Sequence, residues 1–229
     1  MPTFQSSPLY EHGDPDSLGI LVVNLGTPDA PTRKAVRRYL KQFLWDQRVV
    51  ELPRPLWWLI LNGVILTVRP SQSAVAYEKI WTEDGSPLLL HSQAIADGIG
   101  QQLTARTSGP VHVELGMSYG QPSIDSALQR LYEKGARRLV CLPLYPQYSG
   151  TTSGSALAQV TRALSQPRCV PESRFNNPYH DARGYNAAAA QSIREYREQP
   201  GAADKLLFSF HGLPRQNLHD GDPYHCQCH

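Results

Sequence analysis

The sequence has few cysteines and no large excess of positive or negative charge, and each of these shortages argues against a class of protein. Four cysteines in 229 residues fall far short of the density of a disulfide-linked scaffold, which predicts a reducing compartment, the cytoplasm. The formal net charge is only +2, and no Lys- or Arg-rich run with interleaved aromatics occurs, so nothing supports nucleic-acid binding. Residues 1–17 lack a basic segment followed by an apolar one, so we expect no signal peptide.

Long apolar runs are also lacking, and the longest one has two interpretations. Residues 56–66 are apolar almost without interruption, but a bilayer-spanning helix needs about 20 such residues. The run is either a buried helix or part of an apolar lip over residues 53–70. Such a lip would receive a flat hydrophobic ligand or enter a membrane interface, with Trp57 and Trp58 as anchors.

Strand patterns alternate with helix patterns along most of the chain. Residues 18–25 form a continuous apolar run closed by Gly26, which is typical of a parallel strand buried on both faces. The same reading predicts further strands at 111–117, 138–144, 169–174 and 205–210, and helices at 32–44, 89–103, 122–134, 155–164 and 181–198. This alternation predicts right-handed βαβ units and an open parallel sheet.

The predicted elements divide into two α/β domains of the doubly wound, Rossmann-like type. A boundary near Gln166-Pro167 gives a first domain over residues 1–166 and a second over residues 167–229. The second domain would hold a separate sheet of two strands around one helix. Because a parallel sheet needs cover on both faces, we expect this domain to be incomplete and a C-terminal segment to be missing.

Aromatic residues and one histidine follow the predicted strands, where ligands bind in open α/β sheets. A pocket lined by Tyr119, Tyr145, Tyr148 and Phe210 would suit a large aromatic ligand better than a nucleotide. No Gly-x-Gly-x-x-Gly or Walker-type loop is present, which disfavours dinucleotides and nucleoside triphosphates. His211 follows the last predicted strand and could accept a proton or ligate a divalent metal; the alternative is a hydrogen-bonded structural histidine.

Four motifs resemble the successive signatures of the ferrochelatase family. In the family's order they are residues 19–28 (GILVVNLGTP), 144–149 (LYPQYS), 208–214 (FSFHGLP) and 221–224 (GDPY). The residues of these motifs most resemble those of the bacterial protoporphyrin type. The resemblance implies a chelatase-like pair of doubly wound domains with a porphyrin cleft between them. It also implies a lyase of haem biosynthesis that inserts ferrous iron into protoporphyrin IX.

The resemblance implies roles for individual residues as well. His211 matches the active-site histidine that binds iron, takes protons from the pyrrole nitrogens, or both, and His180 resembles a second histidine of proton handling. The positions that resemble porphyrin-contacting or cleft residues are Arg69, Tyr77, Ser86, Tyr119 and Tyr145. Metal insertion expels two pyrrole protons, so a base of near-neutral pKa must stand close to the ring.

The family's opposing glutamate and closing C-terminal helix have no counterpart in this sequence. A single imidazole rarely holds a divalent ion, so one alternative is a porphyrin- or haem-binding module without turnover. The other alternative, which concerns the porphyrin, is a coproporphyrin-type ferrochelatase. We expect Fe²⁺ as a substrate and no tightly bound cofactor. An iron–sulfur cluster is not expected, because Cys226-Gln227-Cys228 falls short of four ligands.

Overall fold

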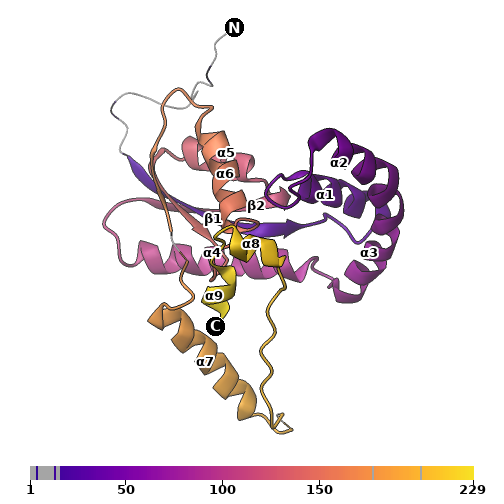
Figure 1. Ribbon diagram of the computed structural model, residues 1–229. Coiled ribbons are helices and arrows are strands. Elements are labelled where there is room, and N and C mark those ends of the chain that lie inside the picture. The colour runs from indigo at the N-terminus through magenta and orange to yellow at the C-terminus, as the bar shows by residue number, and fades with distance from the viewer. Residues whose placement is uncertain (1–3, 5–12, 14–15, 177, 202) are drawn as a thin grey trace. The chain divides into compact units, whose positions relative to one another are not determined.

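The computed structural model describes residues 4, 13, 16–176, 178–201 and 203–229 (Figure 1). By their internal contacts, the residues fall into two units, and each is described by itself. The first consists of Met1–Leu144 with Thr151–Asn176, and the second of Tyr145–Gly150 with Asn177–His229.

A parallel sheet of four strands in the order β2-β1-β3-β4 lies at the centre of the first unit. Its strands are β1 (Ser17–Thr27), β2 (Val111–Gly120), β3 (Ala136–Pro143) and β4 (Glu172–Phe175). The apolar run predicted as a doubly buried strand forms β1, whose Leu21, Val22 and Val23 are fully buried. The predicted α/β class with a parallel sheet is therefore confirmed.

Six α-helices belong to the described part of the first unit, and three to that of the second. The first six are α1 (Arg33–Trp45), α2 (Arg54–Ile60), α3 (Leu66–Ile80), α4 (Pro87–Thr104), α5 (Ile124–Glu133) and α6 (Ser153–Leu164). The other three are α7 (Arg183–Arg197), α8 (Arg215–His219) and α9 (Tyr224–Cys228). Most of these helices lie where the sequence predicted them, within a few residues at each end.

Helices cover both faces of the sheet, because successive side chains of β1 point to opposite sides. Leu21 and Val23 pack against α5 and α6, whereas Ile20 and Val22 pack against α4. Figure 1 shows α5 and α6 above the sheet and α4 below it. The first unit is therefore doubly wound, and its polar loops gather at the carboxyl ends of the strands.

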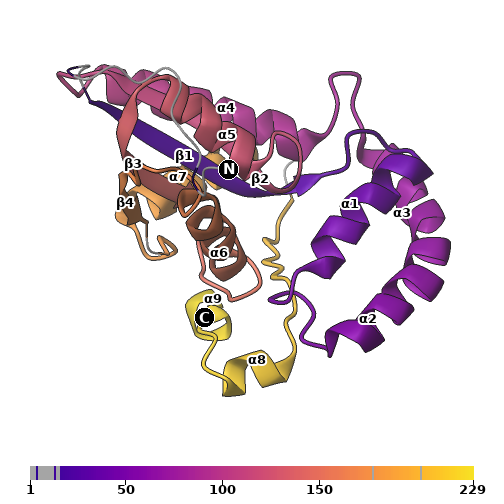
Figure 2. The same cartoon turned by 90° about the horizontal axis from the view of Figure 1, so that it is seen from above.

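The apolar stretch of residues 53–70 folds into α2, a π-helical turn (Leu61–Ile65) and the start of α3. In Figure 2, α1, α2 and α3 lie together beyond the carboxyl ends of β1 and β2. Trp57 is 6% exposed and its Nε1 donates a hydrogen bond to the Leu44 carbonyl at 2.7 Å. Trp58 is 54% exposed. The interpretation of this stretch as a lip with both tryptophans as anchors is therefore wrong for Trp57, which belongs to the core, and the interpretation as a buried helix is right for that residue.

Two expectations about a second sheet were wrong. The strand expected at 169–174 forms as β4, but it pairs with β3 and extends the first sheet. The first unit accordingly runs to Asn176, beyond the boundary expected near Gln166-Pro167. Residues 205–210 form no strand, and Leu207 is 89% exposed. A strand needs a neighbour for its backbone donors and acceptors, and the described residues of the second unit contain no strand to supply one.

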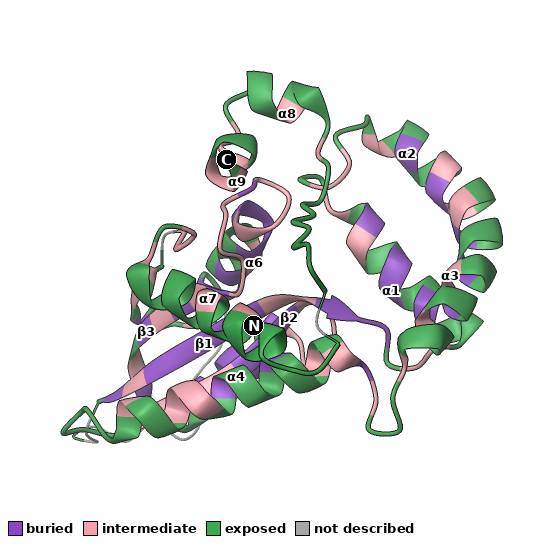
Figure 3. Cartoon of the chain, turned by 90° about the horizontal axis from the view of Figure 1, so that it is seen from below, coloured by how far each residue is buried: buried purple, intermediate pink, exposed green. Residues whose placement is uncertain are grey.

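The second unit has little core among its described residues. No residue of α7 is buried, and Figure 3 shows this helix mostly exposed. Within the described part of the chain, none of the helices has the length and apolar character needed to cross a membrane.

Candidate functional site

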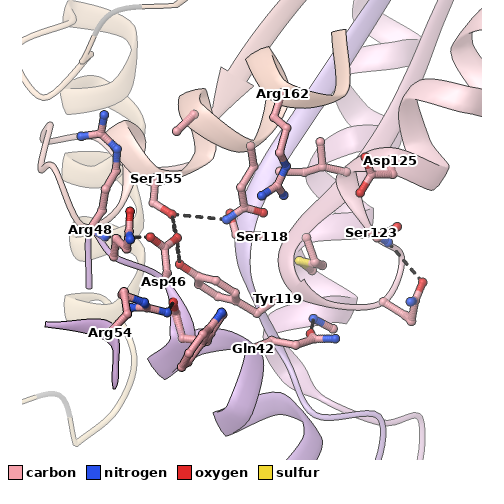
Figure 4. A pocket seen from close by; sticks show the side chains of 18 residues that line it. Gln42, Asp46, Arg48, Arg54, Ser118, Tyr119, Ser123, Asp125, Ser155 and Arg162 are labelled. Atoms are coloured by element: carbon pink, nitrogen blue, oxygen red, sulfur yellow. Dashed lines mark hydrogen bonds between the residues drawn. The ribbon is translucent and has the colours of Figure 1, made fainter. Parts of the chain in front are cut away.

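A cavity of about 570 Å³ opens at the carboxyl end of β2 in the first unit (Figure 4). Its walls come from the end of α1, the start of α2, the turn between β2 and α5, and the first turns of α6. Among the predicted site residues, Tyr119 lines this cavity, while Arg69, Tyr77 and Ser86 do not. The position agrees with the rule that ligands of open α/β sheets bind beyond the carboxyl ends of the strands.

The carboxylate of Asp46 is the hydrogen-bonding centre of this cavity. Its Oδ2 accepts hydrogen bonds from the Tyr119 hydroxyl at 2.7 Å and from the Ser155 hydroxyl, and its Oδ1 accepts the backbone N–H of Arg48 at 2.8 Å. Burial would raise the pKa of Asp46, but these hydrogen bonds and the Arg48 charge outweigh it and place the pKa below its ordinary value. Asp46 is therefore ionised at neutral pH.

Three guanidinium groups, from Arg48, Arg54 and Arg162, also line the cavity. The Arg54 guanidinium lies 3.8 Å from the centre of the Trp45 ring and donates to the Trp45 carbonyl at 2.6 Å. The described residues contain no group of three or more His, Cys, Asp or Glu side chains that could hold a metal ion. The cavity thus brings two carboxylates, Asp46 and Asp125, together with three guanidinium groups.

The other predicted residues of the first unit lie on α3 and at the start of α4. Arg69 is exposed on α3. Tyr77 is half-buried, with its ring edge-on to Tyr39 at 6.3 Å between ring centres, and burial raises the pKa of its phenol. Ser86 is buried and is the N-cap residue of α4.

Three predicted residues, Tyr145, His180 and His211, belong to the second unit. The loop that carries Tyr145 is bonded to the segment before α7, because the Pro146 carbonyl accepts the backbone N–H groups of Tyr179 at 2.9 Å and of His180 at 3.0 Å. The buried Nδ1 of His180 has no hydrogen-bond partner among the described residues. His211 is exposed, and its Nδ1 lies 2.8 Å from the Gly212 carbonyl oxygen.

Comparison with known protein families shows to which family the chain belongs. The family model described as "Ferrochelatase" matches residues 17–229. This chain belongs to the ferrochelatase family. The resemblance drawn from the four motifs is thereby confirmed, and it extends over nearly the whole chain.

Curated ferrochelatases match the chain over most of its length. It is 61% identical over 220 residues to a ferrochelatase of Thioalkalivibrio sulfidiphilus, with 96% of this chain and 60% of that protein covered. It is 52% identical over 219 residues to one of Nitrosococcus oceani, with 96% and 59% covered, and 49% identical over 220 residues to one of Marinobacter nauticus, with 96% and 60% covered. The chain thus spans about 60% of the length of these relatives.

The first ferrochelatase motif has a structural explanation at Gly26. This residue has a φ of +105°, in the left-handed region that favours glycine. A Cβ built there would overlap the carbonyl oxygen of Tyr119, so glycine lets β1 approach the end of β2. The motif therefore also sets where Tyr119 meets the cavity.

Sequence reasoning missed Asp46 and Ser155. Asp46 follows an amphipathic helix, where an acidic residue is unremarkable, and Ser155 opens another helix. Their partner Tyr119 lies 73 and 36 positions away along the chain. This network could have been predicted only from information on which distant positions of the chain are in contact.

Proposed function

We propose that this chain carries the larger part of an enzyme that inserts ferrous iron into a porphyrin to form haem. The observation that carries the proposal is the family match over residues 17–229, joined to 61% identity with a protein named ferrochelatase. His211 lies within one of the four motifs that the chain shares with the family. Porphyrin and Fe²⁺ are then the two substrates.

The environment of His211 suits a base or a metal ligand. A carbonyl oxygen can only accept a hydrogen bond, so the 2.8 Å contact with Gly212 requires the proton of a neutral imidazole on Nδ1. The lone pair of Nε2 is then free to take a pyrrole proton or to bind Fe²⁺. Insertion releases two protons for each iron, and His180 is the second group that we assign to proton handling.

The porphyrin would meet aromatic and cationic side chains of the first unit. Arg69 is exposed and can form a bidentate pair with a propionate carboxylate. Tyr119 is 4% exposed and its hydroxyl is already bonded to Asp46, so this residue would shape the wall of the site rather than offer its hydroxyl to the ring. Tyr77 and Ser86 of the first unit, and Tyr145 of the second unit, complete the proposed porphyrin contacts.

We further propose that the substrate is of the protoporphyrin type and that no tightly bound cofactor, including an iron–sulfur cluster, takes part. The enzyme would work in the cytoplasm, without nucleic acid. Trp58 would provide peripheral contact with a membrane, because it is exposed beside other exposed apolar side chains such as Leu59 and Val64.

The test uses the full-length protein under anaerobic conditions, with Fe²⁺ and either protoporphyrin IX or coproporphyrin III. We expect porphyrin fluorescence to disappear as iron enters the ring, and faster with protoporphyrin. Porphyrin binding without metallation would replace the proposal with a binding module. Failure to bind either porphyrin would refute both.

A further inference from the structure

The loop of residues 145–150, which joins β3 to α6 along the chain, contains neither helix nor strand. It carries Tyr145, one of the proposed porphyrin contacts. The backbone N–H groups of such a loop need acceptors from elsewhere in the molecule, because no neighbouring strand or helical turn supplies them. Two side chains of residues 221–228, the segment that consists of the fourth motif and the rest of α9, provide these acceptors.

Asp222 binds two consecutive residues of the loop through one carboxylate oxygen. Its Oδ2 accepts the Gly150 backbone N–H at 2.7 Å and the Ser149 hydroxyl at 2.9 Å. Ser149 is 1% exposed, so water competes little for this hydroxyl. The other oxygen, Oδ1, accepts the Tyr224 backbone N–H at 3.0 Å, which orients the carboxylate at the start of α9.

Gln227 extends the contact to a third loop residue. Its side-chain oxygen, Oε1, accepts the Tyr148 backbone N–H at 2.7 Å. The Gln227 backbone N–H donates to the Pro223 carbonyl at 3.0 Å, so the helical turn of α9 fixes the base of this side chain. Three consecutive loop residues therefore donate to residues 222–227, although 72 or more positions of the chain separate each pair.

The same loop also holds the segment that precedes α7. The Pro146 carbonyl accepts the backbone N–H groups of Tyr179 at 2.9 Å and of His180 at 3.0 Å. All of these residues belong to the second unit. Within that unit, the loop is thus the hydrogen-bonded link between Asp222 and the backbone of His180.

We propose that Asp222 and Gln227 are positioning residues that fix the 145–150 loop, and with it Tyr145 and the backbone of His180. This inference rests on the proposed function, which assigns porphyrin contact to Tyr145 and proton handling to His180. Neither Asp222 nor Gln227 needs to touch porphyrin or iron. Irregular loops open locally at little cost in free energy unless such bonds hold them, and a shift of about 1 Å is enough to impair a reacting geometry.

The contacts can be broken with little change of side-chain shape. In Asp222→Asn, one oxygen becomes an NH₂ group, which only donates, and both oxygens of Asp222 have donors as partners. Gln227→Met removes the acceptor for Tyr148, whereas Gln227→Glu keeps one. Asp220→Asn is the matched control, because Asp220 is exposed and its side chain accepts from Gln216, within the same short helix end, at 2.8 Å.

The first measurement is amide hydrogen exchange in the full-length protein, with the melting temperature of each variant as a check on global folding. We expect Asp222→Asn to speed exchange at Gly150, and Gln227→Met at Tyr148, by about tenfold or more. Both variants should also speed exchange at His180, because its N–H is bonded to the loop. Gln227→Glu and Asp220→Asn should leave these rates unchanged.

The second measurement is a double-mutant cycle on the Kd for protoporphyrin IX, followed by porphyrin fluorescence. We expect Asp222→Asn to raise Kd about fivefold in the wild-type background and less than about twofold in a Tyr145→Leu background, because both changes act on one contact. In an Arg69→Lys background, the effect of Asp222→Asn should again be about fivefold, since that side chain belongs to the first unit and shares no partner with Asp222.

The outcomes separate this inference from the proposed function. Unchanged exchange at Tyr148, Gly150 and His180 in Asp222→Asn and Gln227→Met overturns the positioning role. An effect on Kd that is as large in Tyr145→Leu as in the wild type also overturns it, because a general loss of structure would act in this way. If the wild-type protein binds no porphyrin, the proposed function fails. The exchange rates then decide by themselves whether the two side chains fix the loop.

Discussion

The Tyr119 hydroxyl donates a hydrogen bond to the Asp46 carboxylate at 2.7 Å across 73 positions of the chain. Ser155 adds a second hydroxyl to the same oxygen, so the carboxylate ties together the ends of α1 and β2 and the start of α6. Hydrogen bonds to a charged acceptor are the stronger kind in proteins. This junction sets the wall of the cavity in the first unit.

Replacement of Asp46 by Asn should lower the free energy of unfolding of the first unit by about 1–3 kcal/mol. The folded-state pKa of Asp46 lies below its ordinary value of 3.8. Its stabilisation is therefore present above about pH 4 and is lost as the pH falls through the folded-state pKa. Urea unfolding followed by tryptophan fluorescence between pH 2 and 7 measures both effects. Asp29→Asn, which removes an exposed ion pair with Arg38, should cost less than about 1 kcal/mol; equal losses would contradict the network.

Trp57 and Trp58 should respond in opposite ways. Trp57→Ala empties a core site and should cost about 3–5 kcal/mol, whereas Trp58→Ala should change stability by less than about 1 kcal/mol. Trp58→Glu should weaken binding to vesicles or porphyrin. Denaturant titration and vesicle co-sedimentation measure these effects. A large loss of stability in Trp58→Ala would show that its exposed position is wrong.

Gly26→Ala should destabilise the first unit by at least about 2 kcal/mol, since an L-residue is strained at this φ and the new methyl group meets the Tyr119 carbonyl. Gly63→Ala is the control: no atom lies near its added Cβ and it sits within a helical segment. That change should be stabilising by about 0.5–1 kcal/mol. Thermal or urea unfolding compares the two, and a tolerated Gly26→Ala would contradict the close approach of β1 to β2.

The thiols should differ in reactivity. Burial raises the pKa of the Cys141 thiol to about 12, while Cys169 and Cys226 are exposed. Because the thiolate is the reactive species, a thiol reagent at pH 8 should modify the exposed cysteines within the native protein and leave Cys141 untouched until it unfolds. Mass spectrometry of the labelled peptides measures this. Modification of Cys141 in the native protein would mean that β3 packs loosely against the helices that cover it.

His211→Ala in the full-length protein should remove iron insertion while porphyrin binding stays nearly intact, because we propose that other side chains bind the ring. Fluorescence loss on metallation and fluorescence titration of porphyrin binding measure the two properties. A variant that retains a tenth or more of the wild-type rate would exclude His211 as the essential base or metal ligand.

The sequence predicted the elements whose own residues form a pattern typical of burial. The run of residues 18–25 indicates a strand buried on both faces, and the helix predicted at 122–134 forms as α5, after which Gly135 adopts a φ of +76°. By contrast, β4 is short and half-exposed, and its place beside β3 depends on a strand about thirty positions earlier. Residues 205–210 have the composition of a strand, but the described chain provides no partner. A local sequence pattern cannot show whether a partner strand is present.

The prediction for the apolar stretch of residues 53–70 failed for another reason. When nearly every residue of a helix is apolar, periodicity does not identify the buried side, so adjacent residues such as Trp57 and Trp58 could not be distinguished. The hydrogen bond from Trp57 to Leu44 decides the orientation, and it joins two helices. The same limit applies to Asp222, whose motif was recognised but whose partners Ser149 and Gly150 lie more than seventy positions away.

β1 is an inner strand of the sheet and also the first strand among the described residues, and this order has a consequence during synthesis. β1 pairs with β2 and β3, so neither neighbour is complete until the ribosome has passed Gly120 and then Pro143. Until then the nascent chain displays a continuous apolar segment without a partner, and exposed segments of this kind favour aggregation. We therefore expect the first hundred or so residues to need protection from aggregation during synthesis.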